Sequence, residues 1–354
     1  MRTVGLLLVL LASGGCRSAG PDPAGGGGSS TGDSTGGGVA AGASGGGTGA
    51  LGGGGASATP TPKYHPPPGF ESCVHADVNA ACSDGWCKLP PSCFVMGSPE
   101  TEWERGRDTE TQTAVTFTHW IEMQQEELTR GDWSSITGEA APGADACQDA
   151  DCPVAMVSWW DGVQVANLLS QNKGLPACYE PVGCSGTLGQ DLACTGVADP
   201  AKSVYECEGY RLPTRAEIEY AARAGTISTF YSGDITEAGQ LSTCVKDEAL
   251  EKIGWYCSNS GNRPHPGGRL GANGFGLFDL IGNLSEWTNE GQHYESSPGG
   301  QNPRGGVGTW TDRLRFGGQY DGWNYLARTA SLLSAPWGAR GNQGGFRLVR
   351  TLPD

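Results

Sequence analysis

Cysteine content is the feature of this 354-residue sequence that most restricts its fold. One of the thirteen cysteines lies at position 16, and the other twelve lie between residues 73 and 257. An even number of cysteines in an exported chain is typical of a disulfide framework, in which each bridge stabilises the fold by about 2–4 kcal/mol, less where the loop is short. We therefore expect disulfides to use all twelve: Cys73, Cys82, Cys87, Cys93, Cys147, Cys152, Cys178, Cys184, Cys194, Cys207, Cys244 and Cys257.

Spacing alone does not settle which cysteines pair. Close spacing favours local bridges, such as Cys147 with Cys152 and Cys178 with Cys184. Zinc is the alternative use of so many cysteines. Tetrahedral zinc sites have closely spaced ligand pairs, whereas no two cysteines here have C-x2-C spacing and the five histidines are scattered. Disulfides are therefore favoured over zinc.

The N-terminus has the layout of a secretory signal peptide. Arg2 precedes an apolar run at residues 4–12 that is too short to span a bilayer, and small residues then lead to Cys16. This cysteine resembles that of the bacterial lipobox, where the thiol is lipidated, although Ser13 stands where a leucine is usual. We expect a signal peptide over residues 1–16, lipidation of Cys16 and a membrane anchor on the periplasmic or cell-surface side. The alternative is a plain signal peptide cleaved nearby.

Composition divides the remainder of the chain into a tether and a domain. Residues 20–62 are dominated by Gly, Ser, Thr, Ala and Pro, which cannot bury enough surface to offset the entropy of ordering. We expect a disordered tether over residues 17–69, a cysteine-rich extension over 70–92 and one folded domain over 93–354. A Gly-rich tether would let that domain stand off from a membrane surface.

The charge of the chain excludes one class of partner. The formal net charge is -15, and the tether carries almost none of it. Binding to nucleic acid needs a basic stripe that contacts phosphates. An acidic domain is therefore not expected to bind nucleic acid.

Two helices are marked by their ends. The first begins near Ser158 and ends at Gly174, and the second begins at Thr214 and ends at Gly225. In each, a hydroxyl residue is followed three positions later by an acidic residue, which is the pattern of a capping box. Apolar residues then recur at helical spacing, and a glycine marks the stop.

The rest of the domain predicts short strands and ordered loops. It is rich in Gly, Pro, Asn and aromatic residues, and short strand-like runs occur at residues 114–117 and 346–349. The sequence therefore predicts a disulfide-rich α+β domain with few long helices and much ordered loop.

Five segments share their order and residues with one known family of domains. They are FVMGS at residues 94–98, PVAMVSWWD at 153–161, RLPTRAEIEYAARAG at 211–225, NGFGLFDLIGNLSEW at 273–287 and GFRLVR at 345–350. Together they resemble the formylglycine-generating-enzyme, or sulfatase-modifying-factor, family. The resemblance implies a single irregular domain related to the C-type lectin fold, here within a bacterial-type lipoprotein.

The chain departs from this family where catalysis would occur. Enzymes of the family oxidise a substrate cysteine to formylglycine with copper held by two cysteines, and thiolates are the natural ligands of Cu(I). The corresponding stretch is residues 315–347, which contains no cysteine. We therefore expect no catalytic residue and no bound copper. The alternative is a formylglycine-generating oxidase with a relocated site, which would need a free thiolate elsewhere. The iron-dependent sulfoxide synthases of the family use histidines in a separate helical domain. We do not expect that chemistry here, because the histidines lack helical H-x3-H spacing.

The turn at residues 281–286 resembles a calcium loop of the family. Calcium binds six to eight hard oxygen ligands, and the resemblance assigns the carboxylate to Glu286 and a ligating or bracing role to Asn283. Backbone carbonyls, and Asn259 at a second family site, complete the expected set: Ile281, Gly282, Leu284 and Asn259. The alternative is a tight turn in which Glu286 pairs with an arginine such as Arg328 or Arg347.

A mixture of aromatic and polar side chains occupies the stretch without cysteines. Such a mixture suits a peptide or a sugar, since stacking and a few directed hydrogen bonds fix the ligand; the alternative is ordinary packing. The sequence thus predicts a lipid-anchored domain that recognises a peptide, glycan or protein. The expected groove residues are Gln319, Tyr320, Trp323, Asn324, Tyr325 and Arg328.

Overall fold

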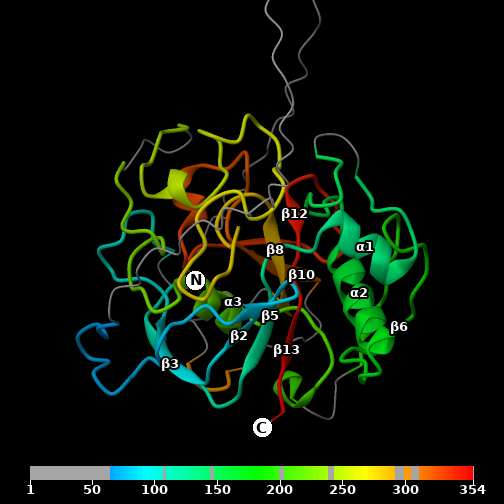
Figure 1. The fold of residues 1–354 in the computed structure, drawn as a ribbon, viewed down its shortest axis with the longest axis horizontal. Helices are drawn as coiled ribbons and strands as arrows, with labels where there is room; N and C mark the ends of the chain where they lie inside the picture. Colours follow the sequence, from blue (N-terminus) through cyan, green and yellow to red (C-terminus); the bar gives the residue numbers. More distant parts are fainter. Residues whose placement is uncertain are drawn as a thin grey trace, which may run out of the picture. The chain divides into compact units, whose positions relative to one another are not determined.

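The computed structural model describes residues 64–106, 109–143, 147–198, 203–237, 243–291, 299–303 and 311–353. The predicted signal peptide, Cys16 and the predicted tether up to residue 63 lie outside these residues. The described part has an α+β fold with three α-helices, short strands and long ordered loops, as the sequence predicts (Figure 1). None of its helices combines the length and apolar character needed to cross a bilayer.

Capping boxes start all three α-helices, which are α1 (Arg130–Thr137), α2 (Trp159–Asn172) and α3 (Arg215–Arg223). In α2 the hydroxyl of Ser158 and the carboxylate of Asp161 exchange hydrogen bonds with each other's backbone, and Thr214 and Glu217 do the same in α3. Both predicted helices are therefore confirmed. The sequence reading missed α1, which is only 8 residues long.

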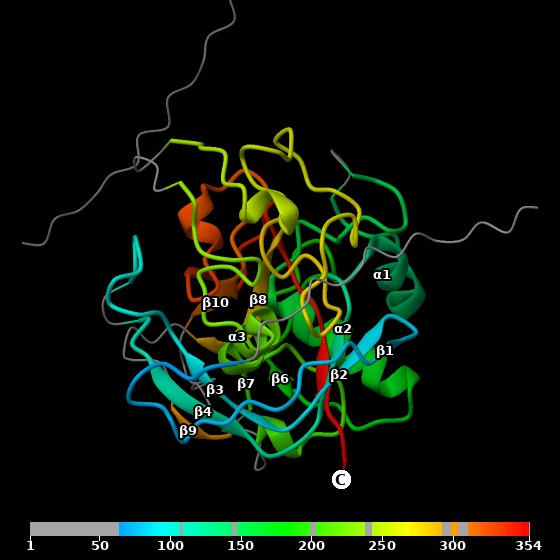
Figure 2. The ribbon, with the colours of Figure 1, turned by 60° about the vertical axis from the view of Figure 1, so that its left-hand side comes forward.

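Thirteen short strands form three small sheets and one hairpin in the described residues. One sheet has the order β1-β2-β5-β13 and a second the order β11-β10-β8-β12. The third has the order β3-β4-β9, and Figure 2 shows these strands side by side. Strands β6 and β7 form the hairpin. The bounds are β1 Cys82–Ser83, β2 Trp86–Leu89, β3 Ser92–Met96, β4 Thr113–Phe117, β5 Ile121–Gln124, β6 Pro181–Val182, β7 Gly196–Val197, β8 Ser285–Gly291, β9 Gly300–Gln301, β10 Asp312–Phe316, β11 Leu332–Pro336, β12 Gly344–Gly345 and β13 Val349–Thr351.

The C-terminal strand differs from the prediction. A single strand over residues 346–349 was expected, but the chain pairs first as β12 with β8 and then as β13 with β5. Between these strands it crosses from one sheet to the other, and the carbonyls of Phe346 and Leu348 accept hydrogen bonds from Leu128 and Gln124. The apolar run therefore reflects burial at a crossing point and not one continuous strand.

Helix α3 lies at the centre of the larger core. All nine of its residues are buried, and Tyr220 packs its ring against Phe94, Phe117 and Phe275. A buried charge is tolerated only when it is paired. Glu217 accordingly pairs with Arg211 at 2.7 Å and Glu219 with Arg223 at 2.9 Å.

Six disulfides join all twelve cysteines in the described residues, as expected: Cys73–Cys93, Cys82–Cys87, Cys147–Cys152, Cys178–Cys207, Cys184–Cys194 and Cys244–Cys257. The suggested bridge between Cys147 and Cys152 is confirmed, but the suggested bridge between Cys178 and Cys184 is wrong. Strands β6 and β7 pair antiparallel and bring Cys184 opposite Cys194. Cys178 precedes the hairpin in the chain, and it pairs with Cys207, which follows the hairpin.

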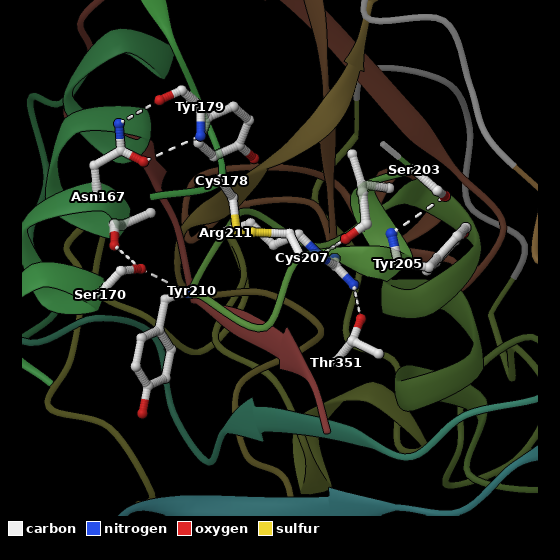
Figure 3. The surroundings of a disulfide bond; sticks show 12 residues. Asn167, Ser170, Cys178, Tyr179, Ser203, Tyr205, Cys207, Tyr210, Arg211 and Thr351 are labelled. Carbon is white, nitrogen blue, oxygen red and sulfur yellow. Dashed lines mark hydrogen bonds between the residues drawn. A yellow bond between two sulfur atoms is a disulfide. The ribbon is translucent and has the colours of Figure 1, made fainter. Parts of the chain in front are cut away.

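The Cys178–Cys207 bridge lies in a network that fixes its loop to α2 (Figure 3). The Asn167 side chain exchanges two hydrogen bonds with the backbone of Tyr179, at 2.9 and 3.2 Å. The hydroxyl of Ser170 accepts a hydrogen bond from the Tyr210 backbone at 2.8 Å. Both ends of the bridge are therefore tied to the same helix.

Candidate functional site

The stretch without cysteines runs from β10 to β12 and contains all six predicted groove residues. After β10 the chain forms a loop, the 3-10 helix η3 (Asn324–Ala327) and β11. The loop is held by backbone hydrogen bonds from Tyr320 to Asn283 and from Cys257 to Gly322. Cys257 is itself bridged to Cys244. The site is therefore built on loops that disulfide and backbone bonds hold in place.

Three of the six predicted groove residues are buried, namely Tyr320, Asn324 and Arg328. The guanidinium of Arg328 bonds to Glu102 at 2.7 Å and to both carboxylate oxygens of Glu110 at 2.7 and 2.9 Å. The side-chain amide of Asn324 donates to the Glu237 carbonyl at 2.8 Å. These side chains hold the site together and are not free to contact a ligand.

The ion pairs of Arg328 also order the carboxylates around it. Burial alone would raise the pKa of Glu110, but its hydrogen bonds and charge interaction with Arg328 hold that pKa below the usual value. Burial outweighs the same guanidinium at Glu102 and raises its pKa. These ion pairs form a fixed support that joins Glu102 and Glu110 to the end of η3.

An aromatic cluster, consisting of Trp103, Trp323 and Tyr325, is only partly buried. It is linked to this support by the Tyr325 carbonyl, which accepts a hydrogen bond from Arg328 Nε at 3.0 Å. Trp323 and Tyr325 stack with ring centres 5.7 Å apart and planes 21° apart. Trp103 meets Tyr325 edge-on at 5.6 Å. The sequence reading missed Trp103, because it lies more than two hundred positions earlier and no spacing signal connects it to the groove. Gln319, the remaining predicted residue, is also partly exposed.

The predicted calcium turn is occupied by contacts within the protein. Both carboxylate oxygens of Glu286 accept hydrogen bonds from Arg347 at 2.7 Å. The Asn283 side chain accepts from the backbone of His265 and donates to Glu127 at 2.6 Å. Within the turn, the backbone N–H of Gly282 donates to the Gly317 carbonyl, and that of Leu284 donates to the Glu127 carboxylate. The side chain of Asn259 accepts a hydrogen bond from Tyr256 N–H and donates one to the Gly254 carbonyl. Gly254 in turn lies against the Ile281 carbonyl.

These contacts do not fit a calcium ion at the turn. The carboxylate expected to ligate calcium is paired with Arg347, the arrangement that was the alternative reading. Among the described residues no three His, Cys, Asp or Glu side chains converge in a way that could hold a metal ion. Calcium binding stays an untested prediction, and an ion there would have to displace Arg347 from Glu286.

Buried carboxylates share that single guanidinium. Glu127, Asp279 and Glu286 are all buried around Arg347. Burial raises the pKa of each acid, and Asp279 reaches about 6 although Arg347 and a hydrogen bond from Gly268 act to lower it. The cluster holds more acids than one arginine can neutralise, so a proton is bound here more easily than in water.

Copper held by two thiolates does not fit these residues either. Every cysteine in the described residues is part of a disulfide, and residues 315–347 contain none. A disulfide sulfur is neither a nucleophile nor a thiolate ligand. Cys16 lies outside the described residues.

Known proteins resemble this chain over most of the described residues. The family of sulfatase-modifying factor enzyme 1-like domains matches residues 107–352. The formylglycine-generating enzyme of Mycobacterium tuberculosis is 35% identical over 175 residues, which cover 42% of this chain and 51% of that enzyme, so this chain spans about half of that relative's length. Chaperone protein LppX of Paenibacillus barcinonensis is 25% identical over 253 residues, which cover 64% of this chain and 78% of that protein.

Solved structures share the fold at lower sequence identity. Variable protein 1 of Treponema denticola superposes with a TM-score of 0.57 at 21% identity and covers 75% of this chain and 94% of its own. PvdO from Pseudomonas aeruginosa superposes with a TM-score of 0.56 at 22% identity and covers 78% of this chain and 98% of its own. These similarities concern the fold alone.

Proposed function

Since this chain belongs to the family of sulfatase-modifying factor enzyme 1-like domains, we propose that it is an extracytoplasmic, lipid-anchored member that recognises a ligand without oxidising it. One observation carries the proposal: all twelve cysteines from Cys73 to Cys257 are in disulfides, and the stretch where the family holds copper has no cysteine. Six disulfides also favour an oxidising compartment. The lipid anchor rests on the signal-like N-terminus with Cys16 alone.

The aromatic cluster supports recognition as the remaining use of the site. Three partly exposed aromatic rings contact one another beside residues that are fixed by the ion pairs of Arg328 with Glu102 and Glu110. Rigid aromatic rings offer contact area at low entropic cost, which suits peptide and sugar ligands. The similar protein of Paenibacillus barcinonensis is named a chaperone protein, which favours a peptide or protein ligand over a glycan.

Thiol counting separates this proposal from the oxidase alternative. In the full chain carrying Cys16→Ser, we expect no reactive thiol in the native state and twelve after reduction in denaturant. Two reactive thiols in the native protein would instead supply ligands for copper and would overturn the non-catalytic proposal.

Ligand binding tests the aromatic cluster. We expect arrays of peptides and glycans to yield ligands that lose binding in Trp103→Ala and in Trp323→Ala, by roughly tenfold or more as for central aromatic contacts. Trp120→Ala is the matched control, because Trp120 is 43% exposed and lies outside the cluster. Equal loss in the control, or no loss in either cluster variant, would contradict a role for the cluster.

A further inference from the structure

Arg315 is a partly buried cation that lacks the anionic partner other arginines of the domain have. Its Nε is buried with no hydrogen-bond partner, and no carboxylate lies within ion-pair distance of its guanidinium in the described part of the chain. Burial lowers the pKa of Arg315, and no neighbouring charge opposes that shift. Six other buried or partly buried arginines pair with carboxylates: Arg211–Glu217, Arg223–Glu219, Arg328–Glu110, Arg340–Asp161, Arg347–Glu286 and Arg350–Glu122.

The surrounding structure holds this guanidinium in one place. Arg315 is on β10 and pairs with Trp287 on β8 and Leu333 on β11. Its guanidinium carbon lies 5.2 Å from the centre of the Trp287 ring. A Cβ atom at Gly344 would lie only 2.5 Å from its Nη1, so the space it occupies exists because residue 344 is a glycine.

A stacking role alone leaves the buried Nε–H of Arg315 without an acceptor. A cation–π contact with Trp287 attracts the positive charge but provides no acceptor for the Nε–H of the guanidinium. A buried donor on a charged group without a partner costs more than a neutral one. An anionic ligand group would remove that cost.

A second unsatisfied atom lies beside the residue that precedes Gly344. The side-chain amide of Gln343 donates to Oδ2 of Asp321 at 3.0 Å. The other oxygen, Oδ1 of Asp321, is buried with no hydrogen-bond partner. The side chain with the unpaired donor, Arg315, therefore lies against Gly344, and the side chain with the unpaired acceptor, Asp321, contacts the neighbouring residue, Gln343.

We propose that Arg315 anchors a carboxylate of a peptide ligand, and that Asp321 accepts a hydrogen bond from an N–H of the same ligand. The proposal rests on the recognition function above and names its ligand chemistry. The planar guanidinium fork matches a carboxylate through two parallel hydrogen bonds. A dianionic phosphate is disfavoured, because the carboxylate of Asp321 and the net charge of -15 repel a second negative charge.

The carboxylate has two sources in peptides, an acidic side chain and a free C-terminus. Three probes distinguish them: acetyl-Gly-Glu-Gly-amide, acetyl-Gly-Gly-Gly with a free carboxylate, and acetyl-Gly-Gln-Gly-amide as the uncharged control. The readout is the Hε–Nε NMR signal of Arg315 in the full chain, assigned by its loss in Arg315→Lys. We expect a saturable shift with at least one carboxylate probe and none with the uncharged probe. No shift, an equal shift with the uncharged probe, or a shift with inorganic phosphate alone would overturn the proposal.

Variants separate the charge from its position. Arg315→Gln should weaken binding of the active probe by about tenfold or more, the loss expected for hydrogen bonds to a charged group. Gly344→Ala keeps the charge but displaces the guanidinium, so it should weaken binding as well. Arg263→Gln, which removes an exposed arginine, should have no effect. If the two single variants, Arg315→Gln and Gly344→Ala, both bind the probe as the unaltered chain does, the proposed subsite is contradicted.

These outcomes are distinct from failure of the recognition function. Suppose that the native chain has no reactive thiols and that its ligands depend on the aromatic cluster. If the Arg315 NMR signal then does not respond to the carboxylate probes, only the carboxylate subsite is disproved. If the chain has two thiols and oxidises a peptide, the recognition function fails whatever Arg315 binds.

Discussion

At the scale of single residues, the domain is governed by buried charges and the partners that neutralise them. Arg211, Arg328 and Arg347 are each buried and each contact a carboxylate through two or more hydrogen bonds. Around Arg347 the acids outnumber the cation, and burial raises their pKa values. The stability of the domain should therefore depend on pH in a direction set by these acids.

Asp279 provides the first prediction. Its pKa is about 6 in the folded protein against 3.8 for an ordinary aspartate, so between these values the folded chain holds a proton that the unfolded chain has lost. The free energy of unfolding should fall as the pH rises through this window and stay lower above it. Asp279→Asn should raise stability at neutral pH, on the order of 1–3 kcal/mol, and flatten the dependence. The measurement is denaturant unfolding at several pH values.

The geometry at Asp279 permits this substitution. Asp279 has a φ of 53°, which asparagine tolerates, and an amide oxygen could still accept the hydrogen bond from Gly268. Asp149→Asn is the control, because Asp149 is exposed. A less stable Asp279→Asn protein at neutral pH would contradict the raised pKa.

Glu286 provides the second prediction. Glu286 is the acid of this cluster that accepts both hydrogen bonds from Arg347. Glu286→Gln removes that direct ion pair, so it should destabilise the domain by about 3–5 kcal/mol. Glu122→Gln should cost less, since its pair with Arg350 is partly exposed. The loss at Glu286 should be the same in calcium and in a chelator. A calcium-dependent rise in unfolding temperature that Glu286→Gln abolishes would show that the ion replaces Arg347.

At the scale of elements, disulfides hold together loops that regular sheets would hold in other domains. The strands are two to seven residues long, and the loops between them carry most of the twelve bridged cysteines. The loop from residue 178 to residue 207 contains two bridges, and its network with α2 is shown in Figure 3. The two bridges should not contribute equally.

Loop length predicts which bridge stabilises more. Cys178 and Cys207 are 29 positions apart, whereas Cys184 and Cys194 are 10 apart. In the chain-entropy relation these separations correspond to about 3.6 and about 2.7 kcal/mol. Replacing both members of a pair by serine should therefore lower the free energy of unfolding more for the outer bridge. A larger loss for the inner pair would show that the contacts with α2 hold the loop without help from Cys178.

Local chemistry explains which elements the sequence could predict. Capping boxes at Ser158 and Thr214 are encoded within four residues, so α2 and α3 were found. Cys178 pairs with Cys207 because the β6–β7 hairpin separates it from Cys184, and no local rule gives that hairpin. Trp103 joins the aromatic cluster only through a tertiary contact. The sequence predicts that Arg328 contacts a ligand, and only the fold shows that its guanidinium is hydrogen-bonded to the carboxylate of Glu110.

At the scale of the whole molecule, the family fold is kept, while the stretch that corresponds to the family's copper site, residues 315–347, contains no cysteine. The match over residues 107–352 and the similar solved structures establish the scaffold. In the stretch from β10 to β12, where the family holds copper, this chain has two rings of the aromatic cluster, Trp323 and Tyr325, and Arg315, which has no carboxylate partner among the residues that the structure describes. A scaffold that has no cysteine in this stretch but carries partly exposed aromatic rings is suited to binding.

Conversion of a cysteine peptide tests the central claim most directly. The full chain is incubated with a cysteine-containing peptide, oxygen and Cu(I), with the Mycobacterium tuberculosis formylglycine-generating enzyme as positive control. Thiolate–copper chemistry that turns cysteine into formylglycine lowers the peptide mass by about 18 Da. We expect the control to produce this loss and the present chain to leave the peptide unchanged. Turnover of the peptide by this chain, at any copper concentration, would contradict a non-catalytic role.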